Sequence, residues 1–350
     1  MCPSPPSPVL QYRYNFAMAR ILLSLSVYLL SSITVVTAAT STVTTGFIPF
    51  DHEGSQYQTW YSAYTPSERT EFRPLIAVHG GPGFTHDYLD AIQDLASSRP
   101  VIFYDQIGNG NSTHFVYAQA GNDTRWSVDL YLNELKNVID FFGFDSIDIL
   151  GHSWGGILGA EYAVLGPEKL HKLVLSNSLA EMDLWEKSQT QLLSAFPQDV
   201  QEGIAAGFSD RVRYRAALEI FYGSHGCTVH PWPAQLNASF DAFFADPTVA
   251  TKMCGSLLSP NCAPRGTDNG CCRSDRAPVL SKWTIVDRLK NIKVPTLVIN
   301  GAHDIAQDFV IQPFMDNIPN VTHFKFENSS HTPMWEERDR YMSVVADFLA

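Results

Sequence analysis

The chain has little positive charge. Its 350 residues include 24 lysines and arginines against 36 aspartates and glutamates, for a formal net charge of −12. There is no run of basic residues and no interleaving of basic with aromatic side chains, so nucleic acid is not an expected partner. There is also no internal repeat. A composition of 45% hydrophobic and 17% charged residues is typical of a globular protein with room for one large domain and an insertion.

Cysteine is absent between Cys2 and Cys227. The five remaining cysteines are confined to one segment and comprise Cys227, Cys254, Cys262, Cys271 and Cys272. In an oxidising compartment this predicts local disulfide bonds with one thiol left over, in a pairing that the sequence leaves open. A zinc site is the alternative, although the adjacent cysteines at 271 and 272 lack a matching C-x-x-C partner.

A long apolar stretch lies near the N-terminus, where ILLSLSVYLLSSITVVTAAT follows the residues MAR at 18–20. The basic start, the apolar centre and the small residues at 37–39 predict a secretory signal peptide within 1–39, cleaved after Ala38 or Ala39. An uncleaved membrane anchor is the alternative, which the limited length and the interrupting serines disfavour. We expect Met18 to be the initiator, preceded by residues from an over-long gene model.

Five N-x-S/T sequons also point to secretion. They predict a glycoprotein with candidate attachment sites at Asn111, Asn122, Asn237, Asn320 and Asn328. The expected mature protein is secreted and has no stable association with a membrane.

The clearest chemical signal is the stretch 147–156, IDILGHSWGG. An apolar run leads into G-x-S-x-G, and helix-favouring residues follow. A strand, a sharp turn carrying a serine and a helix are typical of the nucleophile elbow of serine hydrolases. Ser153 is therefore predicted to project above a sheet from a strained backbone. Gly151 and Gly155 flank it because a Cβ there would collide with the neighbouring strand and helix.

Apolar runs alternate with helical patterns along the chain. Buried strands are predicted at 74–79, 101–104, 147–150, 170–175, 295–300 and 323–327, with an antiparallel pair in 44–65 and helices at 88–96, 127–142 and 336–349. The alternation predicts an α/β fold with a mostly parallel sheet and helices on both faces. It is interrupted at 179–283, which predicts a helical cap inserted between the core halves 40–178 and 284–350.

An activated serine needs a base, and the base needs an orienting acid. In this architecture the chain order is Ser, then Asp or Glu, then His, each just past a strand. We therefore predict Ser153 as the nucleophile, His331 as the general base and Asp304 as the acid. Asp308, which follows the same strand as Asp304, is the alternative acid. Other nearby histidines are expected to pack or form hydrogen bonds within turns, namely His79, His152 and His303.

The glycine-rich loop HGGPG at 79–83 ends a buried strand, so its backbone can lie beside the elbow. Glycine lets a backbone N–H approach a tetrahedral oxyanion without a side chain in the way. The N–H groups of Gly81 and Trp154 are therefore predicted to form the oxyanion hole.

Together these motifs resemble one family. The resemblance is carried by five motifs in a similar order, namely HGGPG (79–83), DQIGNGNS (105–112), GHSWGG (151–156), INGAHD (299–304) and SSHTPMWEE (329–337). The chain resembles the proline iminopeptidase family of α/β-hydrolases, whose relatives include L-amino-acid amidases. The resemblance extends from about residue 44 to the C-terminus. It implies the α/β-hydrolase fold and release of an N-terminal residue, often proline, from short peptides or amino-acid amides, with no metal or cofactor.

The sequence departs from this family in the cap. Relatives usually carry Gly-Pro-Ser/Asn-Glu-Phe after the cap methionine, and that glutamate helps to bind the substrate's ammonium group. Here Leu257 and Leu258 stand near its position, followed by an inserted run. A buried ammonium without a counter-charge is strongly disfavoured. The alternatives are that the substrate has no free α-amine, that 256–281 is not genuine coding sequence, or that another cap acid takes over, namely Glu181, Glu186 or Glu219.

Three functions remain open from the sequence. The first is a serine aminopeptidase acting on a small peptide or on an amino-acid amide or ester. The second is an esterase or amidase acting on a small natural product. The third is a non-catalytic, hydrolase-like binding protein.

Overall fold

The computed structural model of the protein describes residues 41–68, 70–115, 125–255 and 278–350. Several sequence predictions lie outside these residues, namely those on the signal peptide, Asn122, Leu257, Leu258, Cys262, Cys271 and Cys272. None of the helices in the described ranges is long and apolar enough to span a membrane.

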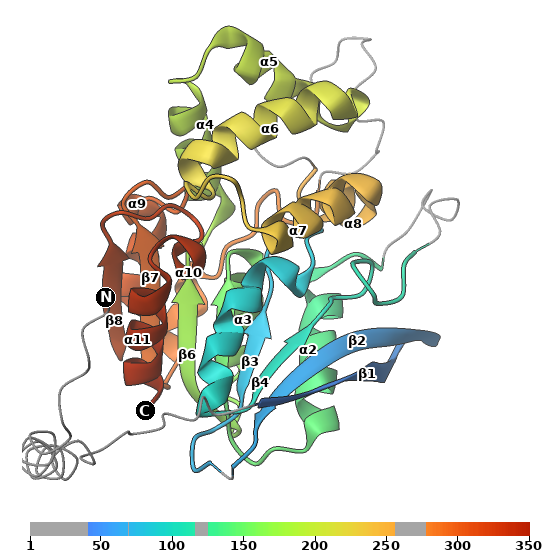
Figure 1. Cartoon of the computed structure of the whole chain (residues 1–350), viewed down its shortest axis with the longest axis vertical. Coiled ribbons are helices and arrows are strands. Elements are labelled where there is room, and N and C mark those ends of the chain that lie inside the picture. The colour runs from blue at the N-terminus through green and yellow to red at the C-terminus, as the bar shows by residue number, and fades with distance from the viewer. Residues whose placement is uncertain (1–40, 69, 116–124, 256–277) are drawn as a thin grey trace, which may run out of the picture. The chain divides into compact units, whose positions relative to one another are not determined.

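The described residues form an eight-stranded sheet in the order β1-β2-β4-β3-β5-β6-β7-β8. The strands are β1 (Ser41–His52), β2 (Ser55–Pro66), β3 (Leu75–Val78), β4 (Val101–Tyr104), β5 (Ile147–His152), β6 (Leu170–Ser176), β7 (Thr296–Gly301) and β8 (Val321–Phe326). Strands β4, β3, β5, β6, β7 and β8 pair in parallel, whereas β1 and β2 form an antiparallel pair at one edge (Figure 1). The predicted mostly parallel sheet is confirmed.

Helices cover both faces of this sheet. Figure 1 shows α11 (Arg338–Leu349) and the cyan 3-10 helix η1 (His86–Ser97) in front of the strands, and α2 (Val128–Phe142) behind them. Helix α2 packs against α3 (Trp154–Ala163), and α9 (Asp308–Asn317) packs on β7 and β8. Four of the strands between these layers are fully buried, since every residue of β3, β4, β5 and β7 is buried.

Local sequence sets the boundaries of α2. The Oγ of Ser127 accepts a 3.0 Å hydrogen bond from the N–H of Leu130 and caps the first turn, and Gly143 ends the helix in the left-handed region with φ of 64°. The apolar face of the helix is buried. The amphipathic helix predicted at 127–142 is confirmed, with Ser127 as its N-cap.

The C-terminal helix differs from its prediction. A continuous helix over 336–349 was expected, but the chain forms α10 (Pro333–Glu336) and α11, which are separated at Glu337 with φ of −126° and ψ of 52°. The predicted closing helix is confirmed over 338–349, and it starts two residues later than expected where the carboxylates of Glu336 and Glu337 accept hydrogen bonds from the preceding loop. A continuous helix beginning at 336 would break these hydrogen bonds between the two glutamates and the loop.

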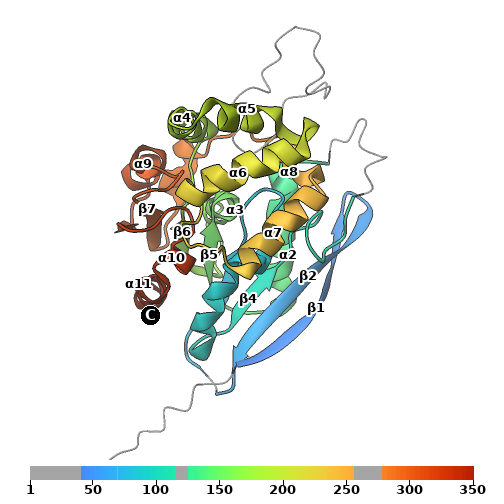
Figure 2. The same ribbon diagram turned by 45° about the horizontal axis from the view of Figure 1, so that its top comes forward.

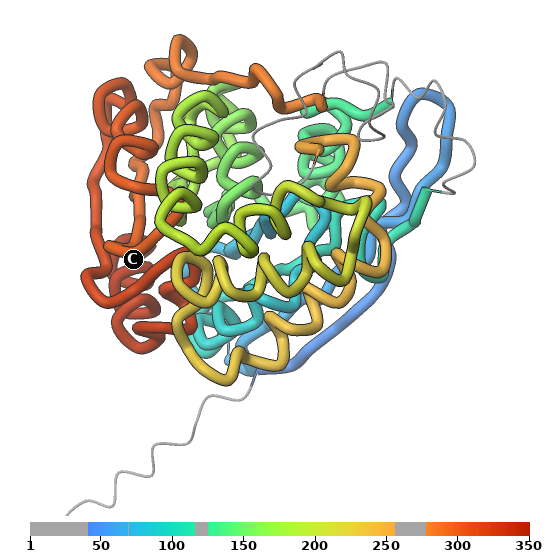
Figure 3. The backbone as a smooth tube through the Cα atoms, turned by 90° about the horizontal axis from the view of Figure 1, so that it is seen from above, coloured from blue at the N-terminus to red at the C-terminus, as the bar shows by residue number. Residues whose placement is uncertain are grey.

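Between β6 and β7 the chain forms a set of helices that we call the cap. It comprises α4 (Met182–Leu193), α5 (Gln198–Ala206), η3 (Gly207–Ser209), α6 (Arg211–His225), α7 (Ala234–Ala245) and α8 (Thr248–Met253). The cap lies over the end of the sheet at which β6 ends (Figures 1 and 2). Seen from above, it lies between the blue strands β1 and β2 and the red C-terminal elements (Figure 3).

The two ends of the cap are held side by side. Glu181 and Thr284 pair in an isolated antiparallel bridge where the chain leaves and re-enters the core. A short 3-10 helix, η4 (Val286–Asn291), follows, and its Arg288 forms two 2.6 Å hydrogen bonds to the carboxylate of Glu161 on α3. This bidentate ion pair attaches the returning chain to the core helix that begins at the elbow.

Gly155 is predicted to be essential for folding because an alanine Cβ there would collide with the carbonyl oxygen of Val78 in β3. We expect Gly155→Ala to lower the free energy of unfolding by about 3 kcal/mol or more, or to prevent folding. Gly159 on the same helix is the control, since its Cβ would lie 3.2 Å from a methyl group of Leu173. Gly159→Ala should change stability by about 1 kcal/mol or less in urea denaturation. Equal losses for the two variants would contradict the steric argument.

Candidate active site

Ser153 stands where β5 ends and α3 begins. Its backbone has φ of 55° and ψ of −121°, a region that non-glycine residues rarely adopt. Three hydrogen bonds hold this conformation, namely Ser153 N–H to Ser176 O at 2.9 Å, Gly156 N–H to Ser153 O at 2.9 Å, and Ser178 Oγ to Ser153 O at 2.8 Å. The strained turn predicted from GHSWGG is therefore present, and Ser153 lines a cavity beneath the cap.

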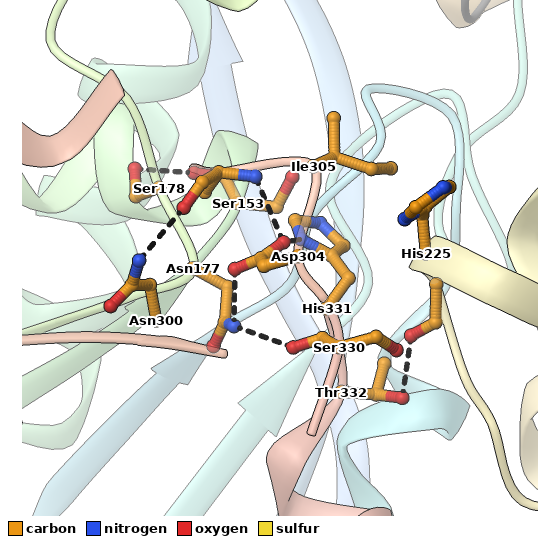
Figure 4. A network of polar contacts seen from close by, with 12 residues as sticks. Ser153, Asn177, Ser178, His225, Asn300, Asp304, Ile305, Ser330, His331 and Thr332 are labelled. Carbon is orange, nitrogen blue, oxygen red and sulfur yellow. Dashed lines mark hydrogen bonds and ion pairs between the residues drawn. The ribbon is translucent and has the colours of Figure 1, made fainter. Parts of the chain in front are cut away.

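His331 and Asp304 form a hydrogen-bonded pair next to Ser153 (Figure 4). The Nδ1–H of His331 donates to Oδ1 of Asp304 at 2.7 Å, and both side chains are buried. The same carboxylate oxygen accepts the N–H of Ala306 at 2.9 Å. With Nδ1 bonded to Asp304, the Nε2 atom of His331 is left to exchange a proton within the cavity that His331 and Ser153 both line.

The alternative acid, Asp308, is placed elsewhere. Its carboxylate accepts hydrogen bonds from Lys325 at 2.8 Å and from Asn300 at 3.0 Å. The Lys325 ammonium lowers the pKa of this carboxyl group below its ordinary value. The structure therefore brings Asp304, and not Asp308, to His331.

Asn177 completes the surroundings of Asp304 and was not singled out from the sequence. It follows the end of β6 with φ of 51°, and its Nδ2 donates to Oδ2 of Asp304 at 2.7 Å and to the carbonyl of Ser330 at 3.2 Å. Both oxygens of the carboxylate are thus engaged. The sequence does contain a signal for this residue, because an asparagine, which tolerates positive φ, stands directly after a buried strand.

The loop that carries His331 is held by the two glutamates at the α10–α11 break. Glu336 accepts hydrogen bonds from the N–H of Ser330 at 2.8 Å and from its Oγ at 2.6 Å. Glu337 accepts the Oγ–H of Ser329 at 2.7 Å. Charge-assisted hydrogen bonds of this kind restrict the loop and so fix the position of the imidazole.

The glycine loop packs directly on the elbow. An alanine Cβ at Gly80 would lie 2.9 Å from the Cβ of Ser153, so only glycine permits this approach. Gly81 has φ of 119°, and both Gly81 and Trp154 line the cavity with Ser153. These positions are consistent with an oxyanion hole, and the donor role of the two N–H groups stays a prediction.

A chain of hydrogen bonds joins this loop to the elbow and to the histidine loop. The N–H of Gly80 donates to Tyr88 Oη at 2.6 Å, and Tyr88 donates to Nδ1 of His152 at 2.8 Å. The Nε2–H of His152 then donates to the carbonyl oxygen of His331 at 2.7 Å. Burial lowers the pKa of His152 well below its ordinary value, so the ring is neutral and has the one donor and one acceptor that the chain requires. Tyr88 also was not identified from the sequence.

The other histidines near the site have structural partners. Nε2 of His79 accepts the N–H of Gln106 at 3.0 Å, and burial lowers the pKa of His79 to about 4. The carbonyl of His303 accepts a hydrogen bond from His225 at 2.8 Å. The bond at His79 agrees with the hydrogen-bonding role expected for it, whereas the bond at His303 involves its backbone carbonyl, so the role expected for that side chain stays a prediction.

The cavity has a mostly apolar wall. The side chains that surround Ser153 and His331 include Phe84, Ile157, Leu179, Met182, Trp185, Leu236 and Leu280. Glu186 of α4 is the carboxylate among the described residues that line it. The other two acids proposed from the sequence lie away from the cavity, since Glu219 is exposed and bonded to Arg215, and Glu181 is in the bridge at the base of the cap.

The described residues include only some of the predicted disulfide cysteines and glycosylation sites. Cys227 and Cys254 are not bonded to each other. The asparagines of four sequons lie at exposed positions, namely Asn111, Asn237, Asn320 and Asn328. Glycosylation and disulfide formation stay predictions. The described residues contain no cluster of three or more residues able to hold a metal ion.

The chain is similar to known α/β-hydrolases. A family model described as the alpha/beta hydrolase fold matches residues 73–219. The proline iminopeptidases of Lactobacillus delbrueckii subsp. bulgaricus and Clostridioides difficile are 30% and 31% identical to this chain, each covering 88% of it and 98% of their own length. The chain belongs to the proline iminopeptidase family of α/β-hydrolases.

The solved structure of a family member has the same fold. The crystal structure of the proline iminopeptidase from Mycobacterium smegmatis is 34% identical, with a TM-score of 0.74, over 87% of this chain and 97% of that one. As a member of the proline iminopeptidase family, the protein is an α/β-hydrolase enzyme of the aminopeptidase type.

The Tyr88 hydroxyl is expected to support both folding and turnover. Tyr88→Phe leaves the buried N–H of Gly80 without its acceptor, which should cost about 1–3 kcal/mol of stability. Because the glycine loop and His152 lose their connection, kcat for an activated ester should fall about tenfold. Urea denaturation and steady-state kinetics test this.

Tyr131→Phe is the matched control. The Tyr131 side chain is also buried, but its hydroxyl forms no hydrogen bond within the part of the chain that the structure describes. Its removal should therefore leave stability unchanged or raise it, because an unpaired buried hydroxyl is unfavourable, and should change kcat by no more than about twofold. Similar behaviour of the two variants would show that the Tyr88 hydrogen bonds do not matter.

Proposed function

We propose that this protein is a serine aminopeptidase that releases an N-terminal residue, proline among them, from short peptides or amino-acid amides. The observation that carries the proposal is the 2.7 Å hydrogen bond between His331 and Asp304 beside the strained Ser153. The activity of the proline iminopeptidases to which the chain is similar supports the choice of substrate.

In the proposed mechanism Ser153 Oγ attacks the carbonyl carbon of the N-terminal residue while His331 Nε2 takes the hydroxyl proton. The carboxylate of Asp304 holds the imidazole in the required tautomer and stabilises the imidazolium. The N–H groups of Gly81 and Trp154 would stabilise the oxyanion, a contribution of about 3–4 kcal/mol per donor in other acyl-transfer enzymes. His331 then protonates the leaving amine, and water hydrolyses the acyl-enzyme by the same steps.

The substrate prediction is tested with a panel of aminoacyl-naphthylamides. We expect release from L-prolyl-naphthylamide or another aminoacyl-naphthylamide, and stoichiometric labelling of Ser153 by a fluorophosphonate probe. The Ser153→Ala variant should show neither. Hydrolysis of simple esters alone would favour the esterase alternative, and a folded protein that does not react with the probe would favour the binding protein.

The assignment of the acid is tested with two aspartate variants. Asp304→Asn should lower kcat by about 10⁴-fold, because the amide cannot hold the histidine in the same tautomer. Asp308→Asn is the control and should lower kcat by less than about threefold, because Asp308 pairs with Lys325 and not with His331. Comparable losses of kcat in the two variants would contradict the assignment of Asp304, and not Asp308, as the acid.

A further inference from the structure

Two polar side chains on α4 line the cavity and have no partner among the residues that the structure describes. Glu186 and Gln189 lie three residues apart, and both line the cavity that holds Ser153 and His331. Gln189 is 7% exposed, and neither side chain forms a hydrogen bond or ion pair with any described residue. Ligand cavities are mostly apolar with a few polar groups that orient the ligand, so an amide and a carboxylate with no partner among the described residues indicate a place for a ligand.

Helix α4 contacts His331 and the segment that directly follows Asp304. The ring of Trp185 lies 5.8 Å from that of His331. The Oγ of Ser188 donates to the carbonyl of Ile305 at 2.5 Å and accepts a hydrogen bond from Gln307 at 2.9 Å. These contacts fix the helix at positions next to Glu186 and Gln189, so both groups are held at a defined place relative to Ser153.

Within the described ranges, no cation forms an ion pair with the carboxylate of Glu186. Burial raises the pKa of Glu186 despite the attraction of Lys282. The ammonium of Lys282 is exposed and pairs with Asp183 at 3.1 Å, and it makes no ion pair with Glu186. A partly desolvated carboxylate without a paired cation is unfavourable, and a ligand cation would complete the site.

We propose that Glu186 binds the α-ammonium group of the substrate and that the amide oxygen of Gln189 accepts a second hydrogen bond from it. The inference rests on the proposed function, because an acyl carbon held at Ser153 is separated from its α-nitrogen by a single carbon. The apolar wall next to Glu186 suits an uncharged aliphatic side chain such as the proline ring. Glu186 is then the specificity-determining residue that selects a free α-amine in this chain, where Leu257 and Leu258 stand near the position of the usual cap glutamate.

The experiment compares substrates with and without an α-amine on the full chain. The ratio of kcat/KM for L-prolyl-naphthylamide to that for 4-nitrophenyl acetate is measured for the wild type, for Glu186→Gln and for Glu219→Gln. We expect Glu186→Gln to lower this ratio about 100-fold, mainly through KM, and Glu186→Asp to restore part of it. Glu219→Gln, which removes an exposed cap acid outside the cavity, should leave the ratio unchanged within about twofold.

Inhibition gives an independent readout. Prolinamide should inhibit acetate hydrolysis by the wild type at least tenfold better than cyclopentanecarboxamide, which lacks the amine. Glu186→Gln should lose this preference. Should that variant fail to fold, Gln189→Leu replaces it, with an expected decrease of about tenfold in the substrate ratio.

The experiment distinguishes failure of the ammonium site from failure of the proposed function. A ratio within threefold of wild type in Glu186→Gln, with prolyl-naphthylamide still cleaved, would overturn the ammonium site and leave the aminopeptidase function intact. A wild-type enzyme that hydrolyses the acetate but no aminoacyl-naphthylamide would overturn the proposed function, and the ammonium site with it.

Discussion

The backbone strain at Ser153 is the constraint on which the rest of the structure depends. A non-glycine residue with φ of 55° is stable only where its surroundings determine its conformation. Here those surroundings are β5, α3 and the end of β6, and α3 also approaches β3 so closely that a Cβ on Gly155 would collide with the carbonyl oxygen of Val78. The same close approach admits the Gly80 loop to the side of Ser153. One local distortion thus determines which residues around it must be small.

The cap is part of the same arrangement because it contacts the loops that surround Ser153. Phe84, just after the glycine loop, packs on Phe240 and Phe243 of α7 with ring centroids 5.1 and 5.2 Å apart. Thr332, next to His331, donates to the carbonyl of Gly226 at 2.8 Å. Movement of the cap would therefore disturb the glycine loop and the histidine loop together. Substrate binding and acyl transfer are expected to be coupled through these contacts.

Much of the fold was predictable because its signals are local. Continuous apolar runs identified the buried strands, and the serine at position 127 identified the start of α2. The closing helix was predicted correctly except for its start, because the break at Glu337 accompanies hydrogen bonds to the loop at 328–330. Asn177 and Tyr88 were missed for a similar reason, since their partners lie on strands and loops distant in the sequence.

The sequence by itself determined the order of the elements, the family and the candidate residues Ser153, Asp304 and His331, because motif spacing and apolar periodicity are properties of neighbouring residues. Only the tertiary structure decided between Asp304 and Asp308, since both follow β7 and differ in the side chain that the fold brings to them. It also placed Glu186, rather than Glu181 or Glu219, in the cavity. A helix presents each side chain to one direction only, and the packing of α4 on the core set that direction for Glu186.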